Sequence, residues 1–202
     1  MKTLTRSRTK ILRTAYGRMQ DEAKRLGASG IIGSHISQRE IAEDLWEYSL
    51  QGTAVGSCPS RPDKQPFVCT LSGQDYYSLT TAGYRPVGVA LGVCIYYQKY
   101  HQRVQQKITS SGAIPQGQNA ERSDFTRGIY TARRYAMAEL EAEASALGAI
   151  GVLGVSVTAQ RTLNRQYGTT EGMMIDFTVM GTAIAHASSS PLSFDYCMPL
   201  TD

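Results

Sequence analysis

The sequence contains an internal repeat, and this repeat restricts the possible folds more than any other feature. The segment Leu26–Gly33 returns as Leu147–Gly154, 121 positions later (147 − 26). Gly52–Val55 returns as Gly181–Ile184, 129 positions later (181 − 52), so the second copy has eight extra residues (129 − 121) between these blocks. The excess falls around 164–172, a polar stretch typical of a hairpin loop. A pattern that occurs twice predicts two structural units of the same kind.

Each copy predicts one long helix followed by two strands. Apolar residues recur every three or four positions from Phe125 to Leu147, which is the spacing of one face of an amphipathic helix. Gly27 and Gly148 follow the two stripes and predict the helix ends. The stripe of the first copy consists of Leu12, Ala15, Met19, Ala23 and Leu26. The expected strands, paired as antiparallel hairpins, are 31–36 and 45–55 in the first copy and 150–158 and 173–185 in the second.

The two copies differ at their beginning. A strand is expected at 85–97, ahead of the second helix, whereas the first helix starts almost at Met1 with no strand before it. The predicted fold class is α+β, with two tandem β-α-β-β repeats, the first lacking its initial strand, and antiparallel sheets with one long helix each. The expected parts are a first repeat at 1–56, a proline-rich linker at 57–71, a second repeat at 72–187 and a C-terminal tail at 188–202.

The missing strand predicts an unpaired sheet edge in the first copy. Three occupants remain open: the C-terminal segment Leu192–Leu200, a neighbouring subunit of the same protein, or a partner protein that adds a strand. A further interpretation is that the missing strand lies upstream of the first residue of this sequence.

Composition and charge exclude several classes of protein. Of 202 residues, 42% are apolar and 19% are charged, which is ordinary globular usage. The net charge of +4 is too small to indicate a nucleic-acid-binding protein. The longest apolar run, 86–97, is shorter than the roughly 20 residues that cross a membrane as a helix. Residues 1–20 are basic like a transit peptide, but they belong to the repeat and so are expected to be part of the fold. The four cysteines form no close pair. We therefore expect a cytoplasmic protein with reduced thiols.

A known family carries the same pattern of blocks. Leu26–Gly33 with Gly52–Val55, the matching blocks of the second copy, and Ala82–Gly92 as a first strand resemble the YbjQ-like family of "putative heavy-metal-binding" domains. The resemblance covers most of the chain, although the first copy lacks the first strand of the family. It implies a dodecin-like β-α-β-β subunit, a ring-shaped homo-oligomer that is commonly a pentamer, and a divalent or soft metal ion as the bound group.

His35, Cys58 and Cys69 are the candidate metal ligands. Soft metal ions bind converging thiolates and imidazoles, which close pairs in the sequence normally signal, and this chain has no such pair. Cys58 and Cys69 flank the linker, and a metal site would require them to meet His35 across it. The alternative is that these cysteines have no metal role. Cys94 lies in an apolar strand and is expected to be buried in the core.

The repeated glycines do not predict a phosphate-binding loop. They follow a helix and enter a strand, which is the reverse of the order that brings helix N-terminal amides to a phosphate. We interpret them as structural or interface positions that end a helix or allow backbones to approach closely. The set comprises Gly27, Gly30, Gly33, Gly52, Gly148, Gly151, Gly154 and Gly181.

The sequence predicts a non-catalytic assembly protein. The three histidines form no triad spacing, and the basic first helix has acidic neighbours and no aromatic platform for nucleic acid. The second helix is acidic, so we expect basic and acidic helices to pack around a ring, with Arg13 and Arg134 as interface residues. The main hypothesis is a ring-forming protein with a heavy-metal or small-ligand role and no membrane partner. The alternatives are an adaptor that binds a partner through the exposed sheet edge, and an enzyme that acts at subunit interfaces.

Overall fold

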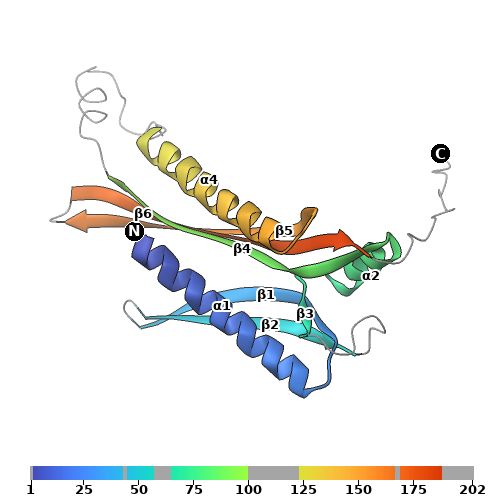
Figure 1. Ribbon diagram of the computed structural model, residues 1–202. Helices are drawn as coiled ribbons and strands as arrows, with labels where there is room; N and C mark the ends of the chain where they lie inside the picture. Colours follow the sequence, from blue (N-terminus) through green and yellow to red (C-terminus); the bar gives the residue numbers. More distant parts are fainter. Residues whose placement is uncertain (1, 43–44, 57–64, 100–122, 167–168, 188–202) are drawn as a thin grey trace, which may run out of the picture.

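A computed structural model describes residues 2–42, 45–56, 65–99, 123–166 and 169–187 (Figure 1). The chain alternates long helices with hairpins of long strands. In chain order the elements are α1 (Lys2–Arg25), β1 (Gly30–Ala42), β2 (Leu45–Val55), β3 (Phe67–Val68), α2 (Gly73–Thr81), β4 (Tyr84–Lys99), α4 (Ser123–Ala146), β5 (Gly151–Gln166) and β6 (Thr169–His186).

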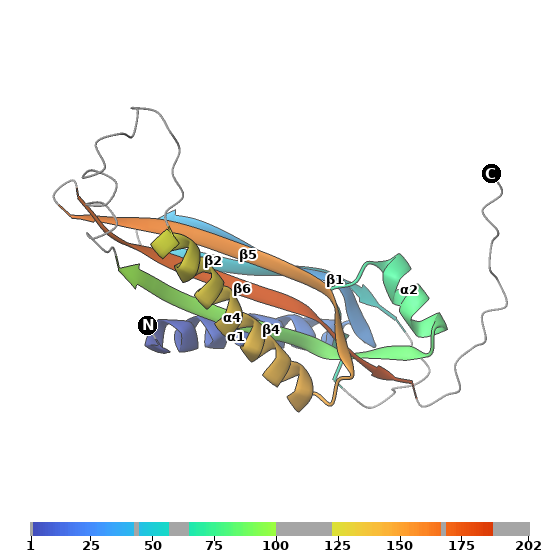
Figure 2. The same cartoon turned by 90° about the horizontal axis from the view of Figure 1, so that it is seen from above.

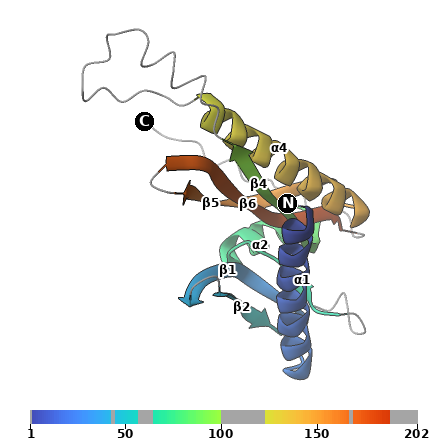
Figure 3. The ribbon, with the colours of Figure 1, turned by 90° about the vertical axis from the view of Figure 1, so that its left-hand side faces the viewer.

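The strands form two three-stranded sheets. The first sheet has the order β2-β1-β3 and the second the order β4-β6-β5. All pairs are antiparallel except β1 with β3, which run parallel. Figures 1 and 3 show α4 on one side of the second sheet, with the first sheet and α1 on its other side. Seen from above, α4 lies along the sheet over β4 (Figure 2).

Both long helices end at a glycine, as their sequences predict. Gly27 and Gly148 have φ angles of 69° and 68°, a left-handed conformation that glycine adopts without steric cost. The next amides reach back to the last turn, with Ala28 N 2.9 Å from Ala23 O and Ala149 N 3.0 Å from Ala144 O. These bonds satisfy carbonyl groups that the helix leaves free, and they turn each chain directly into the following strand.

The largest core lies between α4 and the second sheet. Small residues on α4 allow the helix to approach closely, and Ala132, Ala136 and Leu140 are at most 2% exposed. They face Ile175 and Val179 of β6, both fully buried. A second apolar cluster joins the two halves of the chain, and it consists of Leu12, Ile36 and Tyr48 with Val89, Leu91, Val93 and Met180. The two sheets therefore form one packed body.

Several sequence predictions need correction. The strands are longer than expected, because β1 runs to Ala42, and β5 and β6 extend through most of the stretch predicted as a loop around 164–172. Within the predicted linker 57–71, Phe67 and Val68 form a short strand that pairs with β1, so the sheets are not purely antiparallel. This segment forms a strand because of tertiary contacts and not because of its own sequence pattern. Phe67, Val68 and Cys69 are at most 7% exposed, and their burial stabilises an extended segment that has no strand periodicity.

Candidate functional site

Side chains close the outer edge of β4. The amide of Leu91 donates to Glu143 Oε2 at 2.8 Å, and that of Val93 donates to Glu139 Oε2 at 3.2 Å. The amide of Ile95 donates to Thr5 Oγ1 of α1 at 3.1 Å. Another strand would have to displace these acceptors to pair with β4, so this edge is protected against strand addition.

The outer edge of β2 has no such protection within the described residues. β2 is the last strand of its sheet and pairs only with β1. Large apolar side chains lie exposed at the far end of this hairpin, with Leu45 55%, Trp46 39% and Ile41 53% exposed. An open edge next to apolar side chains is a surface on which an added strand gains both backbone hydrogen bonds and side-chain burial.

The helix α1 also exposes an apolar stripe. Leu4 and Ile11 are 50% and 49% exposed, and Leu26, which directly follows the helix, is 77% exposed. At the repeat offset of 121 positions, Ile11 corresponds to Ala132 of α4, which is fully buried. The difference follows from the strands. The helix α4 covers β4, with Gly92 close beneath it, whereas the described residues place no strand at that position of the first sheet. The stripe and the β2 edge therefore mark the place of the missing strand.

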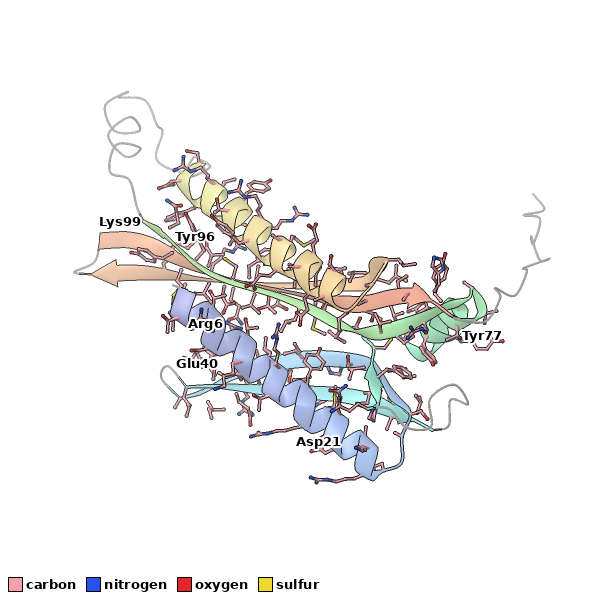
Figure 4. The ribbon with its side chains drawn as sticks, viewed as in Figure 1. Arg6, Asp21, Glu40, Tyr77, Tyr96 and Lys99 are labelled. Carbon is pink, nitrogen blue, oxygen red and sulfur yellow. The ribbon has the colours of Figure 1, made fainter. Side chains whose placement is uncertain are left out.

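A groove of about 930 Å³ runs between α1, β4 and α4. Its floor is apolar, with Val93, Ile95 and Tyr96 from β4. Basic residues of α1, Arg6, Lys10 and Arg13, line one side, and Tyr135 and Glu139 of α4 line the other. Figure 4 labels Arg6 on α1 and Tyr96 on β4, the elements that border the groove. Its size is that of a small-molecule site, and its chemistry suits a ligand with an apolar body and an anionic group.

Polar contacts connect the two sheets. The Arg8 guanidinium forms an ion pair with Asp176 and donates to Gln38 Oε1. Its carbon atom lies 5.0 Å from the centre of the Tyr48 ring. Burial lowers the pKa of the Arg8 guanidinium from its ordinary value. Thr70 of the segment after β3 contacts Thr182 of β6, with 2.7 Å between their hydroxyl oxygens.

The candidate metal ligands do not form a metal site in the described part of the chain. Cys69 is fully buried, and its sulfur accepts hydrogen bonds from the Leu71 amide at 3.3 Å and the Thr182 hydroxyl at 3.7 Å. Burial raises the pKa of this thiol, which disfavours the thiolate that a metal requires. His35 is exposed on β1, and Cys58 lies outside the described residues. The described ranges contain no group of three or more His, Cys, Asp or Glu side chains placed to hold a metal ion.

The glycines singled out from the sequence lie at close contacts and turns. A Cβ at Gly52 would come 2.6 Å from Ile31 Cγ2, and one at Gly181 would come 2.6 Å from Val152 Cγ1. Gly33 and Gly154 have φ angles of 62° and 59°, at the register shifts of their hairpins. Gly30 lies against the Phe67 ring, whereas a Cβ at Gly151 would come no closer than 4.0 Å, to Ile184 Cγ1.

The two arginines predicted at interfaces lie on different surfaces. Arg13 Nη2 is 3.1 Å from Glu143 Oε1, so basic α1 contacts acidic α4 within one chain. Arg134 is exposed on α4, with its guanidinium 5.6 Å from the centre of the Tyr135 ring. Sequence reasoning missed the role of Glu139 and Glu143 in closing the β4 edge. The sequence signal for this role was the spacing of the two acidic residues, which are four positions apart and therefore lie on one helix face.

Comparison with known proteins assigns the chain to a family. The model of the family described as "Putative heavy-metal-binding" matches residues 1–57 and 85–187. The chain belongs to this YbjQ-like family. The YbjQ-like chain is also similar to the Encapsulin nanocompartment protein Rv1762c of Mycobacterium tuberculosis, with 34% identity over 182 residues that cover 87% of the chain. The chain spans 65% of the length of that relative.

The helices of the YbjQ-like chain give no indication of a membrane crossing. In the described ranges, none has the length together with the apolar composition that a bilayer span requires.

Proposed function

We propose that the protein is a non-catalytic, cytoplasmic subunit of a homo-oligomer, in which a second copy of the chain occupies the place of the missing strand. The observation that carries this proposal is the coincidence of an open β2 edge with the exposed apolar stripe of α1. A segment added there would pair with β2 and be covered by Ile11, as β4 is covered by α4 in the second sheet.

One comparison and one argument from symmetry support an assembly role. The relative of 34% identity is named as an encapsulin nanocompartment protein, which is a term for a protein assembly. A contact between two different surfaces of the same chain generates a ring when its rotation closes. A ring is therefore the form that we propose for the oligomer, and five is the number of subunits that the family resemblance implies.

Replacing Ile11 with glutamate tests this assembly. Burying an isoleucine side chain contributes about 1.5–3 kcal/mol, so the dissociation constant of each interface should rise about 10-fold to 100-fold in Ile11→Glu. Mass photometry over a range of protein concentrations measures the effect. Tyr77→Glu is the matched control, because Tyr77 is 71% exposed on α2, away from β2. Its mass distribution should equal that of the unchanged protein.

An adaptor function is the alternative, with a different protein on the same β2 edge. A single-chain mass of the unchanged protein at every concentration would contradict the homo-oligomer and favour the adaptor. An oligomer that dissociates in Ile11→Glu would contradict the adaptor.

We propose that a ligand binds in the groove between α1 and α4. The proposal that the ligand is a metal ion rests only on the family description. The residues that the structure describes contain no group of side chains placed to bind a metal ion. The three cations beside an apolar floor favour an amphipathic anion instead.

Titration calorimetry with dodecanoate tests the groove. Lys10→Glu should weaken dodecanoate binding about tenfold, because a like charge replaces an attractive one at the rim. Lys24→Glu is the control, since Lys24 is exposed near the end of α1 and does not line the groove. Equal affinities for dodecanoate and uncharged dodecanol would contradict an anion site.

A further inference from the structure

A cavity of about 390 Å³ lies between the two sheets. The first sheet lines it with β1 and Tyr48, the second with β5 and β6, and α1 contributes Arg8 and Leu12. Among the described residues, it shares none of its lining with the groove between α1, β4 and α4. Its volume falls within the range of small-molecule sites, about 300–1,000 Å³.

Hydrogen bonds between the two halves of the chain frame this cavity. Gln38 Nε2 of β1 donates to Gln160 Oε1 of β5 at 3.2 Å. Thr70 Oγ1 donates to the Gly154 carbonyl oxygen of β5 at 3.4 Å. The lining positions 156 and 158 lie between Gly154 and Gln160 along β5, so both bonds help to fix the distance between the cavity walls.

Two buried polar atoms belong to the walls of this cavity and lack a partner. Arg8 Nε and Thr178 Oγ1 have no hydrogen-bond partner within the described residues, and both side chains belong to residues that are only 8% exposed. The other two nitrogens of the Arg8 guanidinium are engaged by Asp176 and Gln38. Buried polar groups are almost always hydrogen-bonded, because an unpaired one loses its hydration without compensation. Two such atoms at one cavity indicate a bound polar molecule.

The charge of the cavity is balanced. In the described ranges, Arg8 is the only Asp, Glu, Lys or Arg side chain that lines it, and Asp176 neutralises the guanidinium. A ligand with a net charge would lose its hydration on entry and gain no free counter-charge. The cavity therefore favours a neutral ligand, in contrast to the basic groove.

The cavity walls combine hydroxyl and amide groups with apolar side chains. Each hydroxyl and each carboxamide can both donate and accept a hydrogen bond, which is also the property of a ligand hydroxyl group. The side chains of this kind are those of Ser156, Thr158, Thr178, Gln38 and Gln160. Leu12, Ile36 and Met180 provide apolar contacts for a carbon skeleton.

We infer that the cavity between the sheets binds a small neutral polyhydroxyl molecule, a sugar or a polyol. One ligand hydroxyl oxygen accepts from Arg8 Nε, and a second hydroxyl group bonds to Thr178 Oγ1. The ligand thereby supplies the partners that the protein leaves out. This site is independent of the groove and of the oligomer proposed above, because it is formed within one chain and has a different lining.

Saturation-transfer-difference NMR on the full chain tests the binding, because this method detects weak ligands of large assemblies. The probes are glucose, myo-inositol and glycerol, and at least one should give a signal that saturates with probe concentration. Thr178→Val should weaken that binding about threefold to tenfold, since it removes one hydrogen bond without changing the shape of the site. Thr131→Val on α4 is the matched control and should leave the affinity unchanged, because Thr131 does not line the cavity.

Two results would overturn the inference. A cavity that holds only water gives no saturable signal with any of the three probes. An equal affinity in Thr178→Val and the unchanged protein would place the bound probe elsewhere. Neither result bears on dodecanoate binding in the groove or on the mass of the oligomer.

The stability of the free protein provides a second, independent measurement. Thr178→Val should raise the Tm by about 2–4 °C without ligand, because it removes a buried hydroxyl that has no partner. Thr182→Val is the matched reference on the same strand and should lower the Tm by about 2 °C or more. The reason is that Thr182 Oγ1 accepts from the Thr70 amide at 2.8 Å, and valine leaves this amide unpaired. Equal losses in both variants would show that Thr178 already has a partner, and would contradict the site.

Discussion

Arg8→Met is expected to cost about 3–5 kcal/mol of the free energy of unfolding. The reason is that the change leaves the Asp176 carboxylate without its partner between the two sheets. The side chains of Arg8 and Asp176 are only 9% and 18% exposed, so water cannot fully replace the lost ion pair. Denaturation in urea, followed by circular dichroism, measures the difference.

Two further variants make the Arg8 prediction specific. Arg13→Met removes a second ion pair between the halves, but Arg13 is 63% exposed, so the loss should stay below about 1 kcal/mol. Asp176→Leu added to Arg8→Met should recover most of the stability, because no buried charge then remains unpaired. A loss in Arg8→Met no larger than that in Arg13→Met would show that the two pairs are energetically alike.

Gly92→Ala is expected to lower the stability by about 3 kcal/mol, because a Cβ at this position overlaps the backbone of α4. It would lie 2.9 Å from the Ala136 carbonyl carbon and 3.0 Å from the Leu140 amide nitrogen. Backbone atoms in the middle of a helix cannot move aside, so the helix and strand must separate. The Tm should fall by about 6–12 °C in a calorimetric scan.

Gly17→Ala is the matched control for Gly92→Ala. Gly17 lies inside α1, and a Cβ there meets no atom within 4 Å. Alanine favours the helix over glycine by about 1 kcal/mol, so this variant should be slightly more stable than the unchanged protein. Destabilisation of similar size at both positions would mean that the close approach of α4 to β4 is not the cause.

Much of the fold follows from local patterns in the sequence. The helical stripes and their glycine stops predict α1 and α4 closely, since both are determined by neighbouring residues. The bounds of β2, Leu45–Val55, match those expected. The short strand at Phe67 and Val68 could not be predicted in this way, because it exists through pairing with β1 and burial of Phe67.

The candidate site was predictable only in part. The sequence pattern predicted an open edge in the first sheet, and among the described residues β2 is an edge strand of that sheet. The closing of β4 by Glu139, Glu143 and Thr5 depends on three amides that meet side chains from two helices. The spacing of Glu139 and Glu143 puts them on one helix face, but it does not specify which strand that face meets. The same reason explains the metal candidates: sequence distance did not reveal that the Cys69 sulfur would be enclosed by Leu71 and Thr182.

By itself the sequence determined the two long helices, the long strands beside them, their order and the asymmetry between the copies, because periodicity, glycine stops and repeat offsets are properties of the chain. The tertiary structure alone decided which edges are closed, where Arg8 is buried and where the groove forms. These features depend on contacts between residues far apart in the sequence, such as Arg8 with Asp176 and Thr70 with Thr182. Such contacts arise from the packing of the two sheets, which local sequence patterns do not specify.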